Sequence, residues 1–96
     1  MQAKLTKRTV ESAQVPTGKQ DVVIWDTEVP GFACRVTEAG GRHYQVFKRV
    51  NGRRVRYRLG QHGPVTADEA RKLARQVIAA MERGEDPAQT RRDART

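Results

Sequence analysis

The chain has 96 residues, of which 36% are hydrophobic and 5% aromatic, so it can form one small domain with a modest core. Its 19 Lys and Arg residues against 11 Asp and Glu give a formal net charge of +8, a balance typical of a domain with a polyanionic partner. One cysteine excludes an internal disulfide, and no apolar run is long enough for a membrane span or a signal-peptide core, so we expect a cytoplasmic protein.

Residues 1–20 are expected to form an N-terminal arm with a short helix. Thr6 is a suitable N-cap for a helix that runs to about Ala13. Lys7 and Arg8 add positive charge to this helix. Two interpretations stay open, since these side chains either contact phosphates or simply keep this end of the chain solvated.

Two short strands are predicted next. The apolar run VVIW begins at Val22 and is bounded by turn residues, which is typical of a strand. In the following strand, residues 32–37, the alternation directs Cys34 inward and Arg35 and Thr37 outward. Tight turns separate these strands from each other and from the next one, so an antiparallel meander is expected.

A β-hairpin is predicted over residues 43–59. Asn51-Gly52 suits a type I′ turn, which needs positive φ at both central positions. Alternation in the two arms gives one face that can be buried, made of Tyr44, Val46, Val50, Val55, Tyr57 and Leu59. The other face is polar and mostly basic, made of His43, Gln45, Phe47, Arg49, Arg54, Arg56 and Arg58.

A long amphipathic helix is predicted over residues 67–83. Thr66 and Glu69 form a capping box at its start, and Gly84 followed by Pro87 would end it. Apolar residues recur at three- and four-residue spacing along one stripe: Ala70, Leu73, Ala74, Val77, Ile78 and Met81. We expect this helix to cover the apolar face of the sheet and to leave the arginine face open.

The predicted fold class is therefore α+β. It consists of a three- to four-stranded antiparallel β-meander sheet, covered on one face by the C-terminal helix, with a short N-terminal helix. We expect the sheet-and-helix domain to span residues 21–87 and residues 88–96 to be a basic linker.

The positive charge is concentrated on the predicted sheet. From Arg35 to Arg58 there are eight Lys and Arg residues against one acid, Glu38. The guanidinium fork suits phosphate oxygens and the guanine edge, and a β-ribbon fits the major groove of DNA. The alternative is a solvated strand surface that resists aggregation. The candidate DNA-binding residues are Lys7, Arg8, Arg35, Thr37, His43, Gln45, Phe47, Arg49, Arg53, Arg54, Arg56 and Arg58.

Phe47 is the exception on this polar face. It either packs on a sugar or a thymine methyl group, or it covers the aliphatic stems of neighbouring arginines, and the second interpretation is favoured. Two or three of the polar side chains are expected to read bases, because half or more of protein–DNA hydrogen bonds go to the backbone.

Catalytic and metal-binding motifs are not found. His43 and His62 have no Cys or carboxylate at metal-ligand spacing, and Cys34 has no catalytic context. The glycine pairs lack the Lys-Ser/Thr of a phosphate-binding loop. We therefore expect no enzyme activity, no metal and no cofactor in these residues.

Several short motifs, taken in order, carry a resemblance to a known family. They are LTKRTV from Leu5, WDTEVPGF from Trp25, RVT from Arg35, NGRR from Asn51 and RGEDP from Arg83. Together they resemble the N-terminal arm-type DNA-binding domain of tyrosine-type phage and genomic-island integrases. The resemblance covers about residues 3–90.

This resemblance implies a sheet and helix like those of AP2-type domains, bound to arm-type sites beside the recombination core of attachment DNA. It implies a site-specific recombinase whose core-binding and catalytic domains lie outside these 96 residues. It also implies other integrase subunits and DNA-bending proteins as partners, and a location at the bacterial nucleoid.

The function predicted from the sequence is sequence-specific binding of double-stranded DNA, with the sheet in the major groove. Two alternatives remain. One is a general binder of double-stranded DNA or RNA without sequence preference, and the other is a basic protein–protein interaction module.

Overall fold

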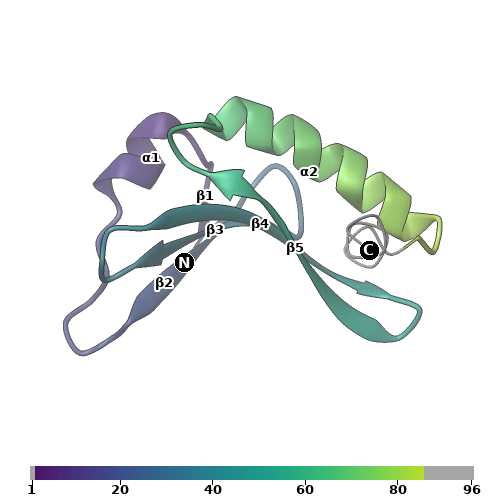
Figure 1. The fold of residues 1–96 in the computed structure, drawn as a ribbon, viewed down its shortest axis with the longest axis horizontal. Coiled ribbons are helices and arrows are strands. Elements are labelled where there is room, and N and C mark those ends of the chain that lie inside the picture. The colour runs from purple at the N-terminus through teal and green to yellow at the C-terminus, as the bar shows by residue number, and fades with distance from the viewer. Residues whose placement is uncertain (1, 86–96) are drawn as a thin grey trace, which may run out of the picture.

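Five strands in the order β1-β2-β3-β4-β5 form one sheet in the computed structural model, which describes residues 2–85 (Figure 1). In chain order the elements are β1 (Gln2–Ala3), α1 (Lys7–Ser12), β2 (Asp21–Asp26), β3 (Phe32–Thr37), β4 (Arg42–Val50), β5 (Arg53–Gln61) and α2 (Ala67–Glu82). The expected α+β fold, an antiparallel meander with a C-terminal helix and a short N-terminal helix, is confirmed. The linker expected at residues 88–96 and the helix stop expected at Pro87 lie outside the described residues.

The strand β1 was not predicted. It pairs with β2 in parallel, with Gln2 opposite Trp25 and Ala3 opposite Asp26. A two-residue strand has no periodicity to detect, so only its partner in space defines it. The sheet is therefore one strand wider than the local patterns indicate.

The hairpin β4–β5 turns at Asn51-Gly52 as predicted. Both residues have positive φ, 51° and 81°, the combination that a type I′ turn requires. The buried face is also confirmed: Tyr44 and Val46 are buried against the core, as is Val55 on the facing strand. A bulge interrupts the register between Tyr44 and Gln45, and such bulges increase the local twist of a sheet.

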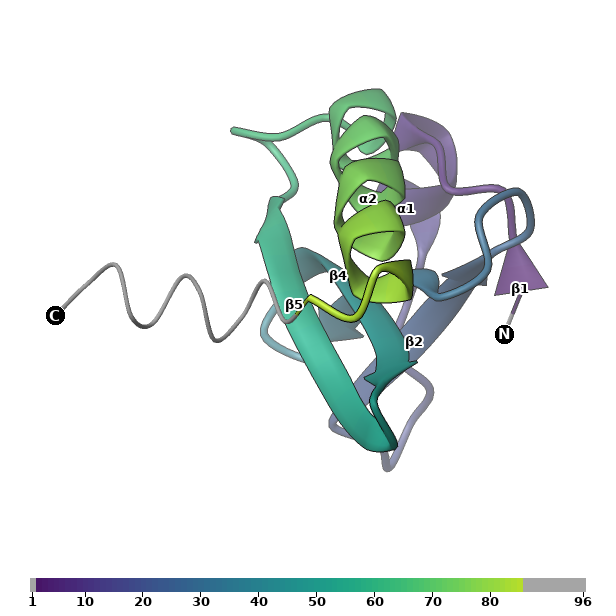
Figure 2. The same ribbon diagram turned by 90° about the vertical axis from the view of Figure 1, so that its right-hand side faces the viewer.

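The helix α2 lies across one face of the sheet, with α1 on the same side of it (Figure 2). Thr66 and Glu69 form the predicted capping box, in which the Thr66 hydroxyl accepts the Glu69 N–H at 3.2 Å and the Glu69 carboxylate accepts the Thr66 N–H at 3.3 Å. Ala70 and Ala74 are buried, because their small side chains let the helix lie close to the sheet. Gly84, with φ of 85°, follows the last turn as predicted.

The prediction that Leu73 belongs to the buried apolar stripe of α2 is wrong. Leu73 is 39% exposed, whereas Arg71, two residues earlier, is buried at 6% exposure. Periodicity alone directed Leu73 inward. The structure turns the helix so that the Arg71 guanidinium enters a polar pocket at the N-terminal end of the chain, and this requirement is invisible in the local sequence.

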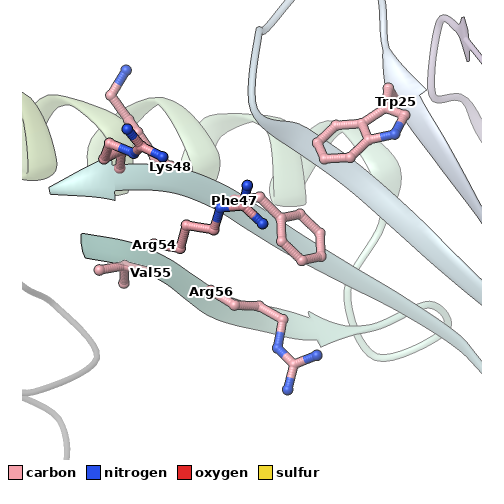
Figure 3. Close-up of a pocket in the computed structure, with 7 residues that line it drawn as sticks. Trp25, Phe47, Lys48, Arg54, Val55 and Arg56 are labelled. Carbon is pink, nitrogen blue, oxygen red and sulfur yellow. The ribbon is translucent and has the colours of Figure 1, made fainter. Parts of the chain in front are cut away.

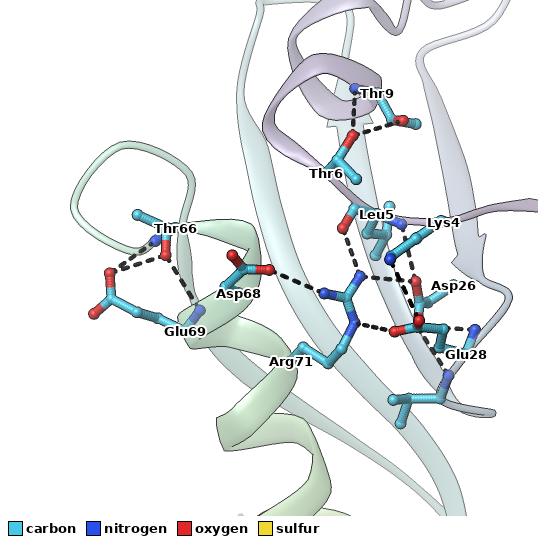
Figure 4. A network of polar contacts seen from close by, with 11 residues as sticks. Lys4, Leu5, Thr6, Thr9, Asp26, Glu28, Thr66, Asp68, Glu69 and Arg71 are labelled. Atoms are coloured by element: carbon cyan, nitrogen blue, oxygen red, sulfur yellow. Dashed lines mark hydrogen bonds and ion pairs between the residues drawn. The ribbon is translucent and has the colours of Figure 1, made fainter.

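A buried polar network surrounds Arg71 and joins three segments (Figure 4). The Arg71 Nη2 atom donates to the carbonyl of Leu5 at 2.6 Å and lies 3.3 Å from Asp26 Oδ1. Asp26 also accepts the N–H of Leu5 at 2.9 Å and the N–H of Val29 at 2.8 Å. The Arg71 Nε atom lies 3.2 Å from Glu28 Oε2. The network thus ties the N-terminal segment and the β2–β3 turn to α2.

The electrostatics of Asp26 follow from these contacts. Burial acts to raise its pKa, but the hydrogen bonds from the Leu5 N–H, Arg71 and the Val29 N–H outweigh burial and hold the pKa below its ordinary value. The carboxylate is therefore charged at neutral pH and balances the buried guanidinium.

The short helix α1 is anchored by side chains from the sheet. Arg42 donates to the carbonyl of Val10 at 2.7 Å and to that of Glu11 at 3.3 Å, and so caps the end of the helix. His62 bridges the Tyr44 hydroxyl, at 2.7 Å, and the Glu11 carboxylate, at 2.8 Å. These bonds hold α1 on the helix side of the sheet.

Candidate nucleic-acid interface

The face of the sheet turned away from α2 is called the outer face from here on. Both ends of the sheet bend away from the helix, so this face is concave (Figure 1). The strand register assigns to it most of the predicted DNA-binding residues, which are Arg35, Thr37, His43, Gln45, Phe47, Arg49, Arg54, Arg56 and Arg58. It also assigns Val23, Trp25 and Ala33 to this face, which makes its centre less polar than the sequence indicated.

Exposed arginines occupy the hairpin part of the outer face. Arg49 and Arg54 lie directly opposite each other on β4 and β5, and Arg56 lies opposite Phe47. Within residues 2–85 no carboxylate lies at ion-pair distance from Arg49, Arg54 or Arg56. Like charges directly opposite each other destabilise a sheet. A bound polyanion would remove this repulsion.

At the other end of the outer face, the polar side chains already interact with groups of the chain itself. Arg35 forms an ion pair with Asp21, with 2.6 Å between Nη2 and Oδ2. The Thr37 hydroxyl accepts the Gly41 N–H at 3.0 Å, inside the β3–β4 turn. Arg35 and Thr37 are thus on the predicted face, but the structure already gives both of them hydrogen-bond partners.

His43 lies between these two regions. Its Nδ1 atom is 3.0 Å from Nη2 of Arg58. Burial, together with the positive charges of Arg58 and Arg35, holds the pKa of His43 below its ordinary value. A neutral imidazole is expected here at physiological pH, with Nδ1 as acceptor from the guanidinium.

Gln45 occupies the middle of the outer face and is 5% exposed. It lies opposite Ala33 on one side and Arg58 on the other. Within the described part of the chain, its amide oxygen is buried without a hydrogen-bond partner. An unpaired buried amide oxygen costs about 1–3 kcal/mol, so the position of Gln45 is not explained by stability.

An aromatic pair lies beside Gln45. The ring centroids of Trp25 and Phe47 are 5.2 Å apart, with 56° between the ring planes. The two residues come from β2 and β4 and meet above β3, because Ala33 and Gly31 contribute almost no side chain there. Figure 3 shows the two rings turned toward each other beside Arg54 and Arg56.

Sequence reasoning missed Trp25. The signal was available: Ala33 alternates outward with Arg35, and antiparallel pairing of the two strands places Trp25 opposite Ala33. The side chain remains 37% exposed. A depression of about 450 Å³ lies beside the rings and is lined also by Arg49, Arg54 and Arg56.

Three predicted residues lie elsewhere. Arg53 pairs with Val50, whose side chain is buried under α2, so the register directs Arg53 to the helix side of the sheet. Lys7 and Arg8 lie on α1, which is also on the helix side (Figure 1). The prediction counted Arg53 with its basic neighbours, although strand alternation separates it from Arg54.

The described residues 2–85 contain no group of three or more His, Cys, Asp or Glu side chains that could hold a metal ion. Cys34 is buried in the core, as predicted, and burial raises the pKa of its thiol to about 11. No helix in the described part of the chain is long and apolar enough to cross a membrane.

The chain is similar to known proteins along most of its length. Residues 5–94 match the model of the family described as the Arm DNA-binding domain. The chain belongs to this family. The arm domain is also 32% identical over 85 residues to the prophage integrase IntF of Escherichia coli (strain K12), a match that covers 88% of this chain and 18% of the relative.

The resemblance noted in the sequence is therefore confirmed. An arm domain is a non-catalytic DNA-binding module, so double-stranded DNA is its partner. The chain spans less than a fifth of the length of the integrase that it matches.

Proposed function

We propose that this arm domain binds arm-type sites of attachment DNA in a sequence-specific manner, with its outer face in the major groove. In doing so it positions a tyrosine recombinase for site-specific integration and excision. The observation that carries the proposal is the composition of the outer face, which places exposed arginines around a centre made of Gln45, Trp25 and Phe47.

Two kinds of contact follow from this composition. Arg49 and Arg54, close together at the hairpin, suit phosphate oxygens and supply affinity that depends on salt. Arg56 and Gln45 lie farther along the strands, where guanidinium and amide groups pair with guanine and adenine edges. A face that bound only phosphates would have no use for a buried amide at its centre.

The integrase context extends the proposal beyond the described residues. We infer that residues 21–87 are the DNA-binding unit, that residues 88–96 lead toward core-binding and catalytic domains, and that other integrase subunits and DNA-bending proteins complete the assembly. The similarity to part of a prophage integrase supports the integrase context.

Selection of bound duplexes from a random pool tests sequence specificity directly. The 96-residue chain is used alone, and the enriched duplex is then compared with random DNA and with duplex RNA in a competition assay. We expect the enriched duplex to bind at least 1,000-fold more tightly than random DNA, in the usual range for specific recognition of about 10³–10⁷. Equal affinity for all three would refute the specific function and favour a general nucleic-acid binder.

Two neighbouring arginines provide a matched test of the face. Arg54→Ala and Arg53→Ala remove the same charge from adjacent positions of β5, but only Arg54 belongs to the outer face. We expect Arg54→Ala, which removes a phosphate contact, to weaken binding on every duplex and to lower the salt slope by about 1, and Arg53→Ala to change both much less. Equal losses would contradict the assignment of the interface to the outer face.

A triple variant separates DNA binding from protein interaction. If Arg54, Arg56 and Arg58 are all changed to Ala and the affinity for DNA is unchanged, the basic face would have to serve an acidic protein partner instead. Circular dichroism of the triple variant confirms that the sheet has formed.

A further inference from the structure

Phosphate binding does not explain the aromatic pair on the outer face. Trp25 is 37% exposed although it is among the largest apolar side chains of the protein, and its ring contacts Phe47 from the neighbouring strand but one. The Phe47 ring has no group that binds a phosphate oxygen, and the Trp25 ring has only its single indole N–H donor. They offer an apolar surface of fixed shape inside a basic face.

The position of the pair limits what it can contact. The rings meet above β3, the middle strand of the sheet, and the depression beside them is bordered by Arg49, Arg54 and Arg56. A ligand group that contacts the rings is expected to be apolar and to be carried on an anionic polymer, because guanidinium groups border the ring surface.

We propose that Trp25 and Phe47 receive the 5-methyl group of a thymine in the major groove. The thymine methyl group is the apolar feature that a base pair presents at the floor of this groove. The faces of the bases are stacked in a duplex and cannot reach the rings. The inference rests on the proposed function, since only a face inside the major groove meets base edges.

The neighbouring side chains support this assignment. Trp25, Ala33 and Gln45 lie in one row across β2, β3 and β4. Phe47 is the next outward residue after Gln45 on β4. Glutamine pairs with adenine, and adenine is the partner of thymine. An amide and an apolar pocket side by side therefore match a stretch of DNA rich in A·T pairs.

The test removes the methyl group alone. In the duplex selected from the random pool, each thymine is replaced in turn by deoxyuridine, and binding of the 96-residue chain is measured by fluorescence anisotropy of a labelled duplex. We expect about a fourfold loss of affinity at one or two positions, the factor for burying one methyl-sized group, and less than a twofold change elsewhere.

Protein variants then assign that loss to the rings. In Trp25→Ala and in Phe47→Ala, thymine and deoxyuridine at the sensitive position should bind equally. Val23→Ala is the matched control, because Val23 lies on the same face of β2 two residues before Trp25, opposite Arg35, and this variant should keep the fourfold discrimination. Circular dichroism verifies that each variant is folded.

Three results overturn the inference. A selected duplex in which no thymine responds to loss of its methyl group would refute it and leave the proposed function intact. Discrimination that persists in both folded variants would show that the rings contact a sugar or the arginine stems instead. A pool that yields no enriched sequence would refute the proposed function, and the inference with it.

Discussion

Replacement of Gln45 by methionine separates stability from DNA binding. The side chain is 5% exposed, and its amide oxygen is buried without a hydrogen-bond partner in the described residues. Methionine has a similar volume and shape but no amide. The substitution therefore removes an unpaired polar group without opening a cavity.

Gln45→Met should leave the stability of the fold unchanged or higher and should weaken DNA binding. Replacing an unsatisfied buried group by an apolar one of the same shape is neutral or stabilising, so the free energy of unfolding of Gln45→Met should be unchanged or higher by about 1 kcal/mol. In a domain of this size that corresponds to a rise in Tm of about 4–8 °C. Loss of a glutamine–adenine contact should cost about 1–3 kcal/mol of binding free energy, or about 5- to 150-fold in Kd.

Thermal unfolding, followed by circular dichroism, gives the Tm, and titration of the selected duplex gives the Kd. Gln76→Met is the control, because Gln76 is exposed on α2, on the opposite side of the sheet from the outer face, so neither quantity should change much. A marked fall in Tm for Gln45→Met would show that the amide supports the fold. An unchanged Kd would show that Gln45 does not contact a base.

Four further predictions concern the fold and the interface. Burial raises the pKa of Asp26, but hydrogen bonds from backbone N–H groups and Arg71 lower it by more, so the charged carboxylate stabilises the fold above about pH 4 and this contribution is lost as the pH falls through the folded-state pKa. Between pH 7 and pH 2, the Tm of Asp26→Asn should therefore decline less than the Tm of the unchanged protein. An equal decline in both proteins would contradict the role of Asp26 in the network. Gly31→Ala should destabilise by about 1–3 kcal/mol in urea unfolding, because Gly31 has φ of 92° and a Cβ there would lie 2.9 Å from the Phe47 carbonyl oxygen. The logarithm of the DNA-binding constant should fall with the logarithm of salt concentration by a slope of about 5 if five or six phosphates are contacted, and a slope near zero would exclude that number of contacts. Trp25 is the single tryptophan of the chain, so its fluorescence should change when DNA is added and stay constant if the DNA binds elsewhere.

Features determined by neighbouring residues could be predicted from the sequence. The positive φ values at Asn51-Gly52 and the capping box of Thr66 and Glu69 depend on residues within a few positions of each other, so the hairpin and the start of α2 were correct. Strand alternation depends only on period two, which is why Arg54 and Arg56 were assigned to the correct face.

Features determined by distant segments could not be predicted in the same way. The exposure of Leu73 follows from the contact of Arg71 with Leu5, which is 66 residues away in sequence. The strand β1 exists only through its pairing with β2. Trp25 is an intermediate case, because its place on the outer face depends on the register between two predicted strands, and that register could have been derived from their alternation.

The small residues in and just before β3 have a consequence for how such a domain can diversify. Trp25 and Phe47 project over Gly31 and Ala33, while the residues that precede them, Ile24 and Val46, are buried in the core. In each of the two strands, a residue that packs in the core is thus followed directly by a residue on the outer face. Under the proposed function, substitution at the outward position alone would change the groups offered to a base pair, whereas Ile24 and Val46 would stay packed in the core. On that proposal, an arm domain with this scaffold would acquire a new DNA preference by single substitutions, without passing through unfolded intermediates.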